Sequence, residues 1–404
     1  ALLASGEIDK SIDPVSLHFQ YTLHAVIPAP GTILQGVRKL EPGHYAWVHK
    51  SGKSESQPYW KLDATRPAKS RSEDEWVDDV HQSLRDAVRK RNDVADVPVG
   101  VLLSGGLDSS LLVALLAELG IKNLHTFSVG FEDQPEEKGS EFEYSDLVVD
   151  RYQPQHHKFL VPNDQVLQRM PEAVDAMSEP MFGQDAVAFY LLSEQVSKDI
   201  KVVQSGQGAD EVFGGYFWYE KMMQETEGSR LDRFRKHYFD RDHPEFLNMV
   251  TSAYSVDDVT GKYVSQRLEE RGADEFIDAI LRLDVTTLIV DDPVKRVDNM
   301  TMAWGLEARV PFLDHHLVEL VAQCPPEIKF KTSGKHLLKR ISRGIVPDEV
   351  MDRPKCYFPM PALKYVRGAF LDFMRDILDT QACRERGVFE RSYIDRLLAA
   401  PEMH

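Results

Sequence analysis

The chain has 404 residues, which is long enough for two domains and a substantial core. Its 48 basic and 65 acidic side chains give a formal charge of −17 at pH 7, and this acidic excess argues against a nucleic-acid-binding surface. The three cysteines have no paired metal-ligand spacing, and no run of about 18 apolar residues occurs, so we expect a reduced, cytoplasmic protein without a membrane partner.

The first part of the chain differs in pattern from the rest. Residues 1–62 predict short β segments and turns, and residues 63–72, rich in Pro, Arg, Lys and Ser, predict a linker. Ser72 and Glu75 have the spacing of a helix capping box, and apolar side chains follow on one helical face. We therefore expect a separate domain over residues 73–404.

Apolar segments alternate with helical segments between residues 97 and 204. We expect strands at 97–103, 124–129, 157–161 and 200–204, and helices near 108–119, 142–152, 164–177 and 185–197. This alternation predicts an α/β fold with a parallel, doubly wound sheet, whose ligands bind outside the carboxyl ends of the strands. After Tyr216 the pattern is almost wholly helical, which predicts a helical C-terminal lobe.

The most informative segment is the loop 104–110, with the sequence SGGLDSS, which joins an apolar strand to a helix. Gly105 and Gly106 allow close backbone approach to a ligand, and the N–H groups at a helix start bind phosphate oxygens. Asp108 could hold Mg²⁺ against those oxygens. The loop lacks the Gly-Lys-Ser or Gly-Lys-Thr of a Walker loop. It resembles instead the Ser-Gly-Gly-x-Asp-Ser loop of the ATP pyrophosphatases, although a turn of small residues without a ligand is the alternative reading.

A second glycine-rich loop, SGQGADEVFGGY at residues 205–216, follows the strand expected at 200–204. Glycine-rich acidic turns often serve only as helix caps, so this loop is less specific by itself. Two such loops at neighbouring strand ends could share one metal–pyrophosphate unit. Asp108 from the first loop and Asp210 from the second are the expected Mg²⁺ ligands.

Four motifs in this order resemble the synthetase domain of glutamine-dependent asparagine synthetases: SGGLDSS, GADEVFGGY, WGLEARVPFLD at 304–314 and KHLLK at 335–339. The resemblance covers about residues 75–400 and implies the adenine nucleotide alpha-hydrolase-like fold of the ATP pyrophosphatases. It also implies that ATP adenylates a carboxylate, aspartate or a related one, that pyrophosphate leaves with Mg²⁺, and that ammonia from glutamine or solution forms the amide. A homodimer is one option for the assembly.

Residues 1–62 resemble the end of that family's N-terminal-nucleophile glutaminase domain. Such a domain needs an N-terminal cysteine, and this sequence starts at Ala1. We expect the chain as given to use free ammonia, with the glutaminase site on a preceding segment.

The resemblance also assigns roles to single residues. The pyrophosphate end of ATP is assigned to Ser104, Gly105, Gly106, Asp108, Ser109 and Ser110, and the adenosine to Leu103, Val129, Ser205 and Gly206. Lys355 matches the lysine that neutralises charge on the phosphates and the adenylate, and Lys335 is a second candidate. Glu211 is assigned to the acceptor site. Arg309 could bind the acceptor carboxylate, or pair with Glu307 or Asp314.

Residue 207 departs from the family pattern. The family carries a glutamate there that assists proton removal, and Gln207 cannot accept a proton at neutral pH. Either another group, such as Glu211 or a substrate carboxylate, takes this role, or the acceptor is not aspartate. The residues in and around the motifs resemble those of a bacterial branch of the family that amidates N-acetylglutaminylglutamine. This dipeptide is the second hypothesis for the substrate.

Two further hypotheses remain, one for a protein of a different class and one for a second kind of enzyme. The loss of the glutamate at Gln207 is also compatible with a non-catalytic nucleotide-binding relative. Sulfur transfer to tRNA, a reaction of another family with this loop, is disfavoured by the acidic charge and the absence of a cysteine pair.

Overall fold

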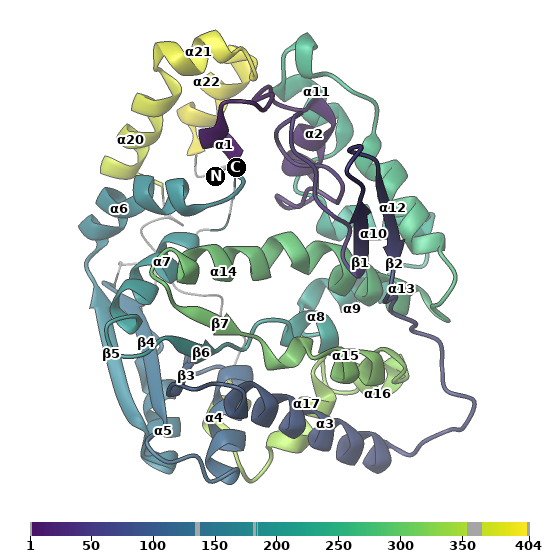
Figure 1. Cartoon of the computed structure of the whole chain (residues 1–404), viewed down its shortest axis with the longest axis vertical. Coiled ribbons are helices and arrows are strands. Elements are labelled where there is room, and N and C mark those ends of the chain that lie inside the picture. Colours follow the sequence, from purple (N-terminus) through teal and green to yellow (C-terminus); the bar gives the residue numbers. More distant parts are fainter. Residues whose placement is uncertain (1, 134–137, 181–182, 184, 354–365, 402–404) are drawn as a thin grey trace.

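The computed structural model describes residues 2–133, 138–180, 183, 185–353 and 366–401. Its centre is a five-stranded sheet in the order β5–β4–β3–β6–β7, in which every neighbouring pair is parallel (Figure 1). The strands are β3 (Val99–Leu102), β4 (His125–Phe131), β5 (Gln155–Val161), β6 (Val202–Gln204) and β7 (Glu307–Arg309). The four strands and the parallel sheet expected from the sequence are therefore confirmed.

The strand β7 was not expected, because we predicted an almost wholly helical region after Tyr216. This expectation was wrong for residues 307–309, which pair with β6 at the edge of the sheet. The strand consists of Glu, Ala and Arg, and its side chains are exposed or half-buried. A short edge strand of this composition has no apolar run by which a sequence pattern could be detected.

Helices cover both faces of the sheet. Helices α3 (Glu73–Asp93), α4 (Leu107–Glu118) and α5 (Phe142–Tyr152) share one hydrophobic core with Val101. Helices α6 (Asn163–Ala176), α7 (Asp185–Val196) and α14 (Lys295–Met302) share a second core with Leu102. Successive strand residues thus face opposite layers, as a doubly wound sheet requires.

Helix α3 begins with the predicted capping box. The Ser72 hydroxyl accepts a hydrogen bond from the Glu75 backbone N–H at 3.2 Å, and the Glu75 carboxylate accepts one from the Ser72 N–H at 2.7 Å. Trp76, Val80 and Leu84 are then buried on one face of the helix. The local pattern and the tertiary core therefore agree at this helix.

A helical lobe adjoins the sheet layer and contains its own apolar core around Tyr219, Phe234 and Ile280. Its helices are α8 (Ala209–Phe213), α9 (Phe217–Gln224), α10 (Arg230–Tyr238), α11 (His243–Met249), α12 (Val259–Glu269) and α13 (Phe276–Leu283). Two π-helical stretches, Asp284–Leu288 and Val290–Val294, connect α13 to α14. The helical lobe that we expected is confirmed.

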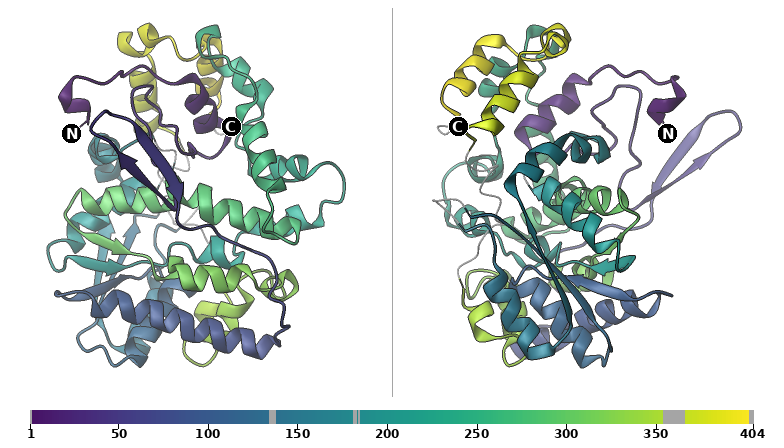
Figure 2. Two further views of the ribbon diagram at one scale, coloured as in Figure 1. Left: turned by 45° about the vertical axis from the view of Figure 1, so that its right-hand side comes forward. Right: turned by 90° about the vertical axis from the view of Figure 1, so that its left-hand side faces the viewer.

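Further short helices complete the C-terminal half. Near the sheet and α3 lie α15 (His315–Ala322), α16 (Pro326–Lys329), α17 (His336–Ser342) and α18 (Asp348–Met351). The chain continues with α20 (Ala369–Leu378), α21 (Gln381–Arg386) and α22 (Arg391–Ala399), beside α11 at the top of Figure 2. No helix in these described parts of the chain is both long and apolar enough to cross a membrane.

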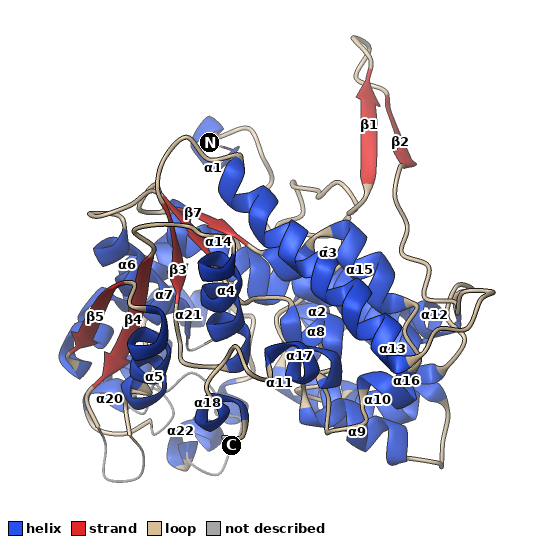
Figure 3. Cartoon of the chain, turned by 90° about the horizontal axis from the view of Figure 1, so that it is seen from below, coloured by secondary structure: helices blue, strands red, loops and turns tan. Residues whose placement is uncertain are grey.

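For residues 1–62 we expected only β segments and turns, and this expectation was incomplete. They also form the helices α1 (Leu2–Ser5) and α2 (Pro14–Thr22), and α2 begins with an Asp13 cap and Pro14 in its first turn. The strands β1 (His44–Val48) and β2 (Ser54–Pro58) form an antiparallel hairpin that projects from the body of the molecule (Figure 3). We missed α2 because its buried face is largely polar, with Ser16, His18 and Gln20.

Candidate active site

The strand order reverses between β3 and β6. The chain runs from β3 outward to β4 and β5, and then returns to the other side of β3 to form β6 and β7. The loops after β3 and β6 therefore leave neighbouring strands in opposite directions, which opens a crevice at this switch point. Both glycine-rich loops predicted from the sequence lie at this position.

The first loop turns tightly into helix α4. Gly105 has φ +76°, and a Cβ atom there would lie 2.7 Å from the backbone nitrogen of Ser145, so only glycine fits. The Ser104 backbone N–H donates to the Ser109 hydroxyl at 3.2 Å. Gly106 is the N-cap residue of α4 and has no side chain to cap it, so the N–H groups of the first helical turn face the loop.

The two loops touch each other. A Cβ atom on Gly206 in the second loop would lie only 3.1 Å from Cβ of Asp108 in the first loop. Helix α8 then carries Asp210 in its first turn. The close approach of the loops brings both predicted Mg²⁺ ligands to one place.

Lys335 connects the two aspartates. Its Nζ atom lies 2.6 Å from Asp108 Oδ2 and 2.9 Å from Asp210 Oδ1. Burial disfavours the charge of Lys335, but the two carboxylates outweigh this effect and raise its pKa above the ordinary value. The loop before α17 holds the residue in position, since the Lys335 N–H donates to the Phe213 carbonyl at 3.0 Å.

A large cleft of about 1590 Å³ surrounds this cluster. Basic side chains line it on the α17 side, namely Lys339, Arg340, Arg343 and Arg353. Arg353 donates to Glu141 at 2.9 Å. Aromatic groups, Phe127, Tyr216 and Trp218, also face the cleft. The volume and the mixture of cationic, small and aromatic groups suit a nucleotide together with a second small molecule.

Most of the residues proposed from the sequence lie along this cleft. They are Leu103, Ser104, Gly106, Asp108, Ser109, Val129, Ser205, Gly206, Gln207, Asp210 and Lys335. Among the described residues, Gly105, Ser110, Glu211 and Arg309 do not line it. Gly105 packs against α5, and Ser110 is fully buried. Lys355 lies outside the described residues.

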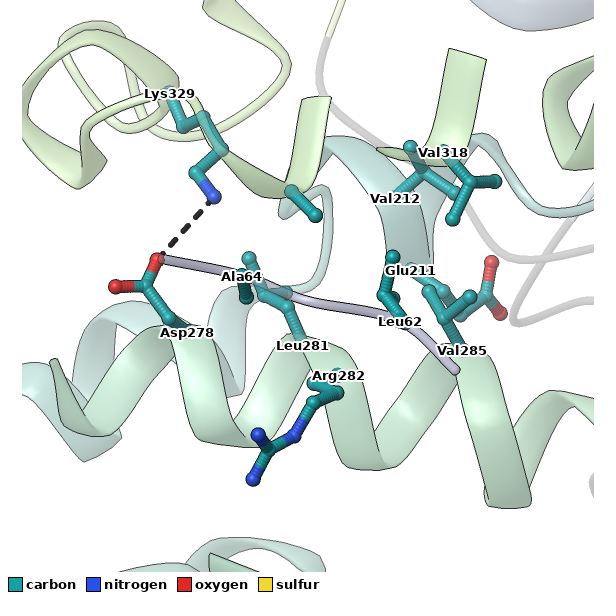
Figure 4. A pocket seen from close by; sticks show the side chains of 11 residues that line it. Leu62, Ala64, Glu211, Val212, Asp278, Leu281, Arg282, Val285, Val318 and Lys329 are labelled. Carbon is teal, nitrogen blue, oxygen red and sulfur yellow. Dashed lines mark hydrogen bonds and ion pairs between the residues drawn. The ribbon is translucent and has the colours of Figure 1, made fainter. Parts of the chain in front are cut away.

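Glu211 faces away from the cleft and into the protein, which places it away from the acceptor position assigned from the sequence. It lines a small internal cavity with Leu62, Ala64 and the ion pair of Asp278 and Lys329 (Figure 4). The Tyr216 hydroxyl donates to its carboxylate at 2.8 Å. Burial, together with the charges of Asp210 and Asp284, raises the pKa of Glu211 to about 8.

Arg309 makes one of the two contacts that the sequence left open. Its Nε atom lies 2.7 Å from Glu307 Oε1, and its Nη1 atom donates to the Arg91 carbonyl. Asp314 is held by Arg91 at 2.9 Å. The guanidinium therefore forms an ion pair at the edge of the sheet. Side chains two residues apart on a strand point to the same face, which brings Arg309 beside Glu307.

A second polar group on the cleft was missed by the sequence analysis. Arg296 on α14 pairs with Asp185 at 3.0 Å and with Asp292, and His24 lies 3.5 Å from Asp292. Arg296, Asp185, Asp292 and His24 all line the cleft. The available signal was the Asp-Asp-Pro sequence at 291–293, where Asp292 interrupts the π-helical backbone with φ −136° and ψ 124°.

The fold and the site define an α/β protein in which two glycine-rich loops, two aspartates and a lysine meet at the switch point of a parallel sheet. The sequence profile of the asparagine synthase family matches residues 79–404, and the chain belongs to this family.

Curated relatives carry matching names. The chain is 28% identical over 433 residues to the glutamine-hydrolyzing asparagine synthetase 1 of Bacillus subtilis, across 98% of this chain and 66% of that protein. It is 29% identical over 402 residues to a putative glutamine-hydrolyzing asparagine synthetase of Mycobacterium tuberculosis, across 90% of this chain and 60% of that protein. The chain thus spans about two thirds of the length of these relatives.

The similarity to solved structures is weaker. NMN synthetase from Francisella tularensis matches with a TM-score of 0.26 and 13% identity, across 58% of this chain and 94% of that one. The assignment of the fold therefore depends on the sheet topology of the chain itself.

Proposed function

We propose that this chain is the synthetase part of an ATP-dependent amide ligase of the asparagine synthetase type. The observation that carries the proposal is the convergence of Asp108 and Asp210, from two separate loops, on Lys335 in the cleft. Family membership supports ATP as the activating substrate. In this reaction a carboxylate attacks the α-phosphorus of ATP and releases pyrophosphate, and ammonia then displaces AMP to form the amide.

The first loop supplies the phosphate site. Backbone N–H groups at the start of α4 and the hydroxyls of Ser104 and Ser109 surround a position where anionic oxygens bind favourably. Lys335, whose raised pKa keeps it charged, adds a positive charge beside this position. Such fixed charges stabilise a developing pyrophosphate without reorganisation during the reaction.

The two aspartates also fit a Mg²⁺ ion. Their carboxylate oxygens already converge on one cationic atom, Lys335 Nζ, and carboxylates are the protein ligands that Mg²⁺ prefers. Asp108 and Asp210 would hold the ion. When bound, it would neutralise negative charge on the phosphates.

The acceptor side of the cleft departs from the family pattern, because residue 207 is glutamine where the family has glutamate. Gln207 lines the cleft and cannot take the proton that ammonia releases, so the proton passes to another acceptor. Arg296, held by Asp185 and Asp292, is the arginine in this region that could orient an acceptor carboxylate. Aspartate and N-acetylglutaminylglutamine are the two acceptors to compare.

Residues 1–62 are proposed to belong to the end of a glutaminase domain that precedes residues 73–404. The aromatic side chains of the β1–β2 hairpin support this assignment, because Trp47 is 67% and Tyr45 41% exposed. An isolated two-stranded hairpin is only marginally stable, and large exposed aromatic groups mark a surface that packs against other structure. A projecting hairpin of this kind is therefore typical of one part of a larger sheet.

The test is pyrophosphate release with ATP, Mg²⁺, ammonium chloride and either acceptor, with AMP and the amide identified by mass spectrometry. We expect one acceptor to give equal amounts of pyrophosphate and AMP. Asp210→Asn should abolish this turnover, whereas Asp257→Asn on the exposed surface of the helical lobe should not. Binding of ATP without pyrophosphate release from either acceptor would contradict the proposal and favour a non-catalytic relative.

A further inference from the structure

Three side chains that could ligate a metal meet outside the cleft. His18 belongs to α2, His243 is the first residue of α11, and Asp258 is the N-cap residue of α12. One ligand atom from each lies within 4.8 Å of the others, and no second group of this kind occurs in the described ranges. The three helices α2, α11 and α12 lie side by side in the upper right of Figure 1.

The hydrogen bonds around His18 determine which ring nitrogen carries the proton. The Thr22 hydroxyl donates to the His18 carbonyl at 2.7 Å, so its proton is used there. The Thr260 hydroxyl, 2.7 Å from Thr22 Oγ1, must then donate to Thr22. Thr260 Oγ1 is left as an acceptor for His18 Nδ1 at 2.8 Å. Nδ1 therefore carries the proton, and the lone pair on Nε2 accepts the hydrogen bond from His243.

This arrangement is the one that metal-ligating histidines adopt, because a partner on the second ring nitrogen orients the first. His18 Nε2 lies 3.0 Å from His243 Nδ1. Two nitrogens that share a tetrahedral Zn²⁺ lie about 3.3 Å apart, given Zn–N distances of about 2.0–2.1 Å. A shift of about 0.3 Å, with the His243 proton carried on Nε2 instead of Nδ1, therefore admits the ion between them.

Asp258 is already oriented by its neighbours. Its Oδ1 atom accepts the Gly261 backbone N–H at 2.8 Å, and its Oδ2 atom accepts from the Arg235 guanidinium at 2.7 Å. A carboxylate has about four lone-pair positions, so both contacts leave capacity for a metal. The positive charge of Arg235 weakens the attraction of Asp258 for a cation. Arg235 does not occupy the ring nitrogens of His18 and His243 that face each other.

The burial of His18 favours coordination. The residue is 0% exposed, so water does not compete for its ring nitrogens. The Thr260 contact on Nδ1 directs Nε2 toward His243, where a metal would bind. A buried histidine pair without a metal, held by one hydrogen bond, is the alternative explanation of the same geometry.

We propose that His18, His243 and Asp258 form a zinc site that joins the N-terminal segment to the helical lobe. Two imidazoles and one carboxylate match the ligand preference of Zn²⁺, with water as the fourth ligand. Because His18 comes from α2 and the other two ligands come from the lobe, zinc bound here would stabilise the docking of α2 by mass action. The site is independent of the catalytic cleft and of the proposed ligase activity.

The test uses the whole chain after treatment with a chelator, titrated with Zn²⁺ against a chromophoric competitor. We expect one Zn²⁺ per chain and the visible absorption of tetrahedral Co²⁺ when cobalt replaces zinc. His243→Gln and Asp258→Asn should each weaken zinc binding by at least about tenfold, because even outer partners of a ligand have effects of 10–100-fold.

The variants are chosen to preserve the fold. Asparagine is as good an N-cap residue as aspartate, so Asp258→Asn keeps the start of α12. His316→Gln, at a histidine side chain 72% exposed on α15, is the matched control and should bind zinc as the unmodified chain does. Less than one Zn²⁺ per chain, or equal zinc affinity in His243→Gln and His316→Gln, would overturn the proposal.

Discussion

Lys335 Nζ and Asp108 Oδ2 lie 2.6 Å apart, although 227 positions separate these residues in the chain. Asp210 completes the cluster at 2.9 Å from the same nitrogen. The three residues come from the starts of α4, α8 and α17, so the cluster depends on the correct packing of three helices around the switch point of the sheet.

The first prediction concerns the charge of Lys335. Lys335→Gln should lower the rate of pyrophosphate release by about 10²–10³-fold, because it removes a fixed positive charge beside the proposed phosphate site. Lys331→Gln, at an exposed lysine that pairs with Glu73, is the control and should retain the rate. Steady-state pyrophosphate assays compare the two variants, and equal rates would remove Lys335 from the proposed mechanism.

The second prediction concerns the space around the cluster. A Cβ atom on Gly215 would lie 2.2 Å from Asp210 Oδ1 and 2.3 Å from Lys335 Cε. Gly215→Ala should therefore displace both groups and abolish Mg²⁺-dependent turnover, while the far-ultraviolet circular dichroism stays unchanged. Gly52→Asn is the control, since residue 52 has open space around it and asparagine tolerates its φ of +84°. Full activity of Gly215→Ala would show that the cluster is not needed in this geometry.

The third prediction tests the start of α3. Ser72→Ala removes the side-chain half of the capping box and should lower the free energy of unfolding by about 1 kcal/mol. Ser72→Asp keeps an acceptor at the N-cap and should lose much less. Urea denaturation of both variants measures the difference, and a similar loss in the two would mean that the cap does not stabilise the helix.

The fourth prediction concerns pH and Glu211. Burial and nearby acidic groups raise its pKa from the ordinary value of 4.5 to about 8, so the folded state binds its proton more tightly than the unfolded state. The stabilisation from this proton is complete below pH 4.5 and is lost as the pH rises through 8. Glu211→Gln keeps an acceptor for the Tyr216 hydroxyl and stays neutral at every pH. The melting temperature of this variant should therefore exceed that of the unmodified chain, and the difference should grow as the pH rises toward 8.5.

The comparison should cover melting temperatures from about pH 4.5 to 8.5, the window given by the pKa of Glu211. Glu269→Gln, on the exposed surface of α12, is the control for loss of one acidic group. If Glu211→Gln and Glu269→Gln gave parallel curves, the buried carboxyl would not be the cause of the pH dependence.

The fifth prediction concerns the cysteines. Cys324 is fully buried, and burial raises the pKa of its thiol to about 12, so it carries almost no thiolate at neutral pH. Cys383 is partly exposed. In the native protein, iodoacetamide should alkylate Cys383 and spare Cys324, as peptide mapping by mass spectrometry can follow. Rapid modification of Cys324 would indicate local opening of its core.

The sequence by itself determined the features that depend on neighbouring residues. The capping box at Ser72 and Glu75, the glycine-rich turn at Gly105 and the alternation of strands and helices follow from local backbone preferences and from burial on one face, so short patterns reveal them. The two loops could also be placed near each other, because the carboxyl ends of parallel strands share one edge of the sheet.

Only the tertiary structure decided which distant side chains meet and which way they point. Lys335 reaches both aspartates, Glu211 turns inward to Tyr216, and His18 meets His243 across the boundary between α2 and the lobe. The lysine and histidine contacts join residues that are far apart in the chain, and the contact of Glu211 with Tyr216 joins α8 to the start of α9. Their formation depends on the packing of whole helices, which no local pattern of residues contains.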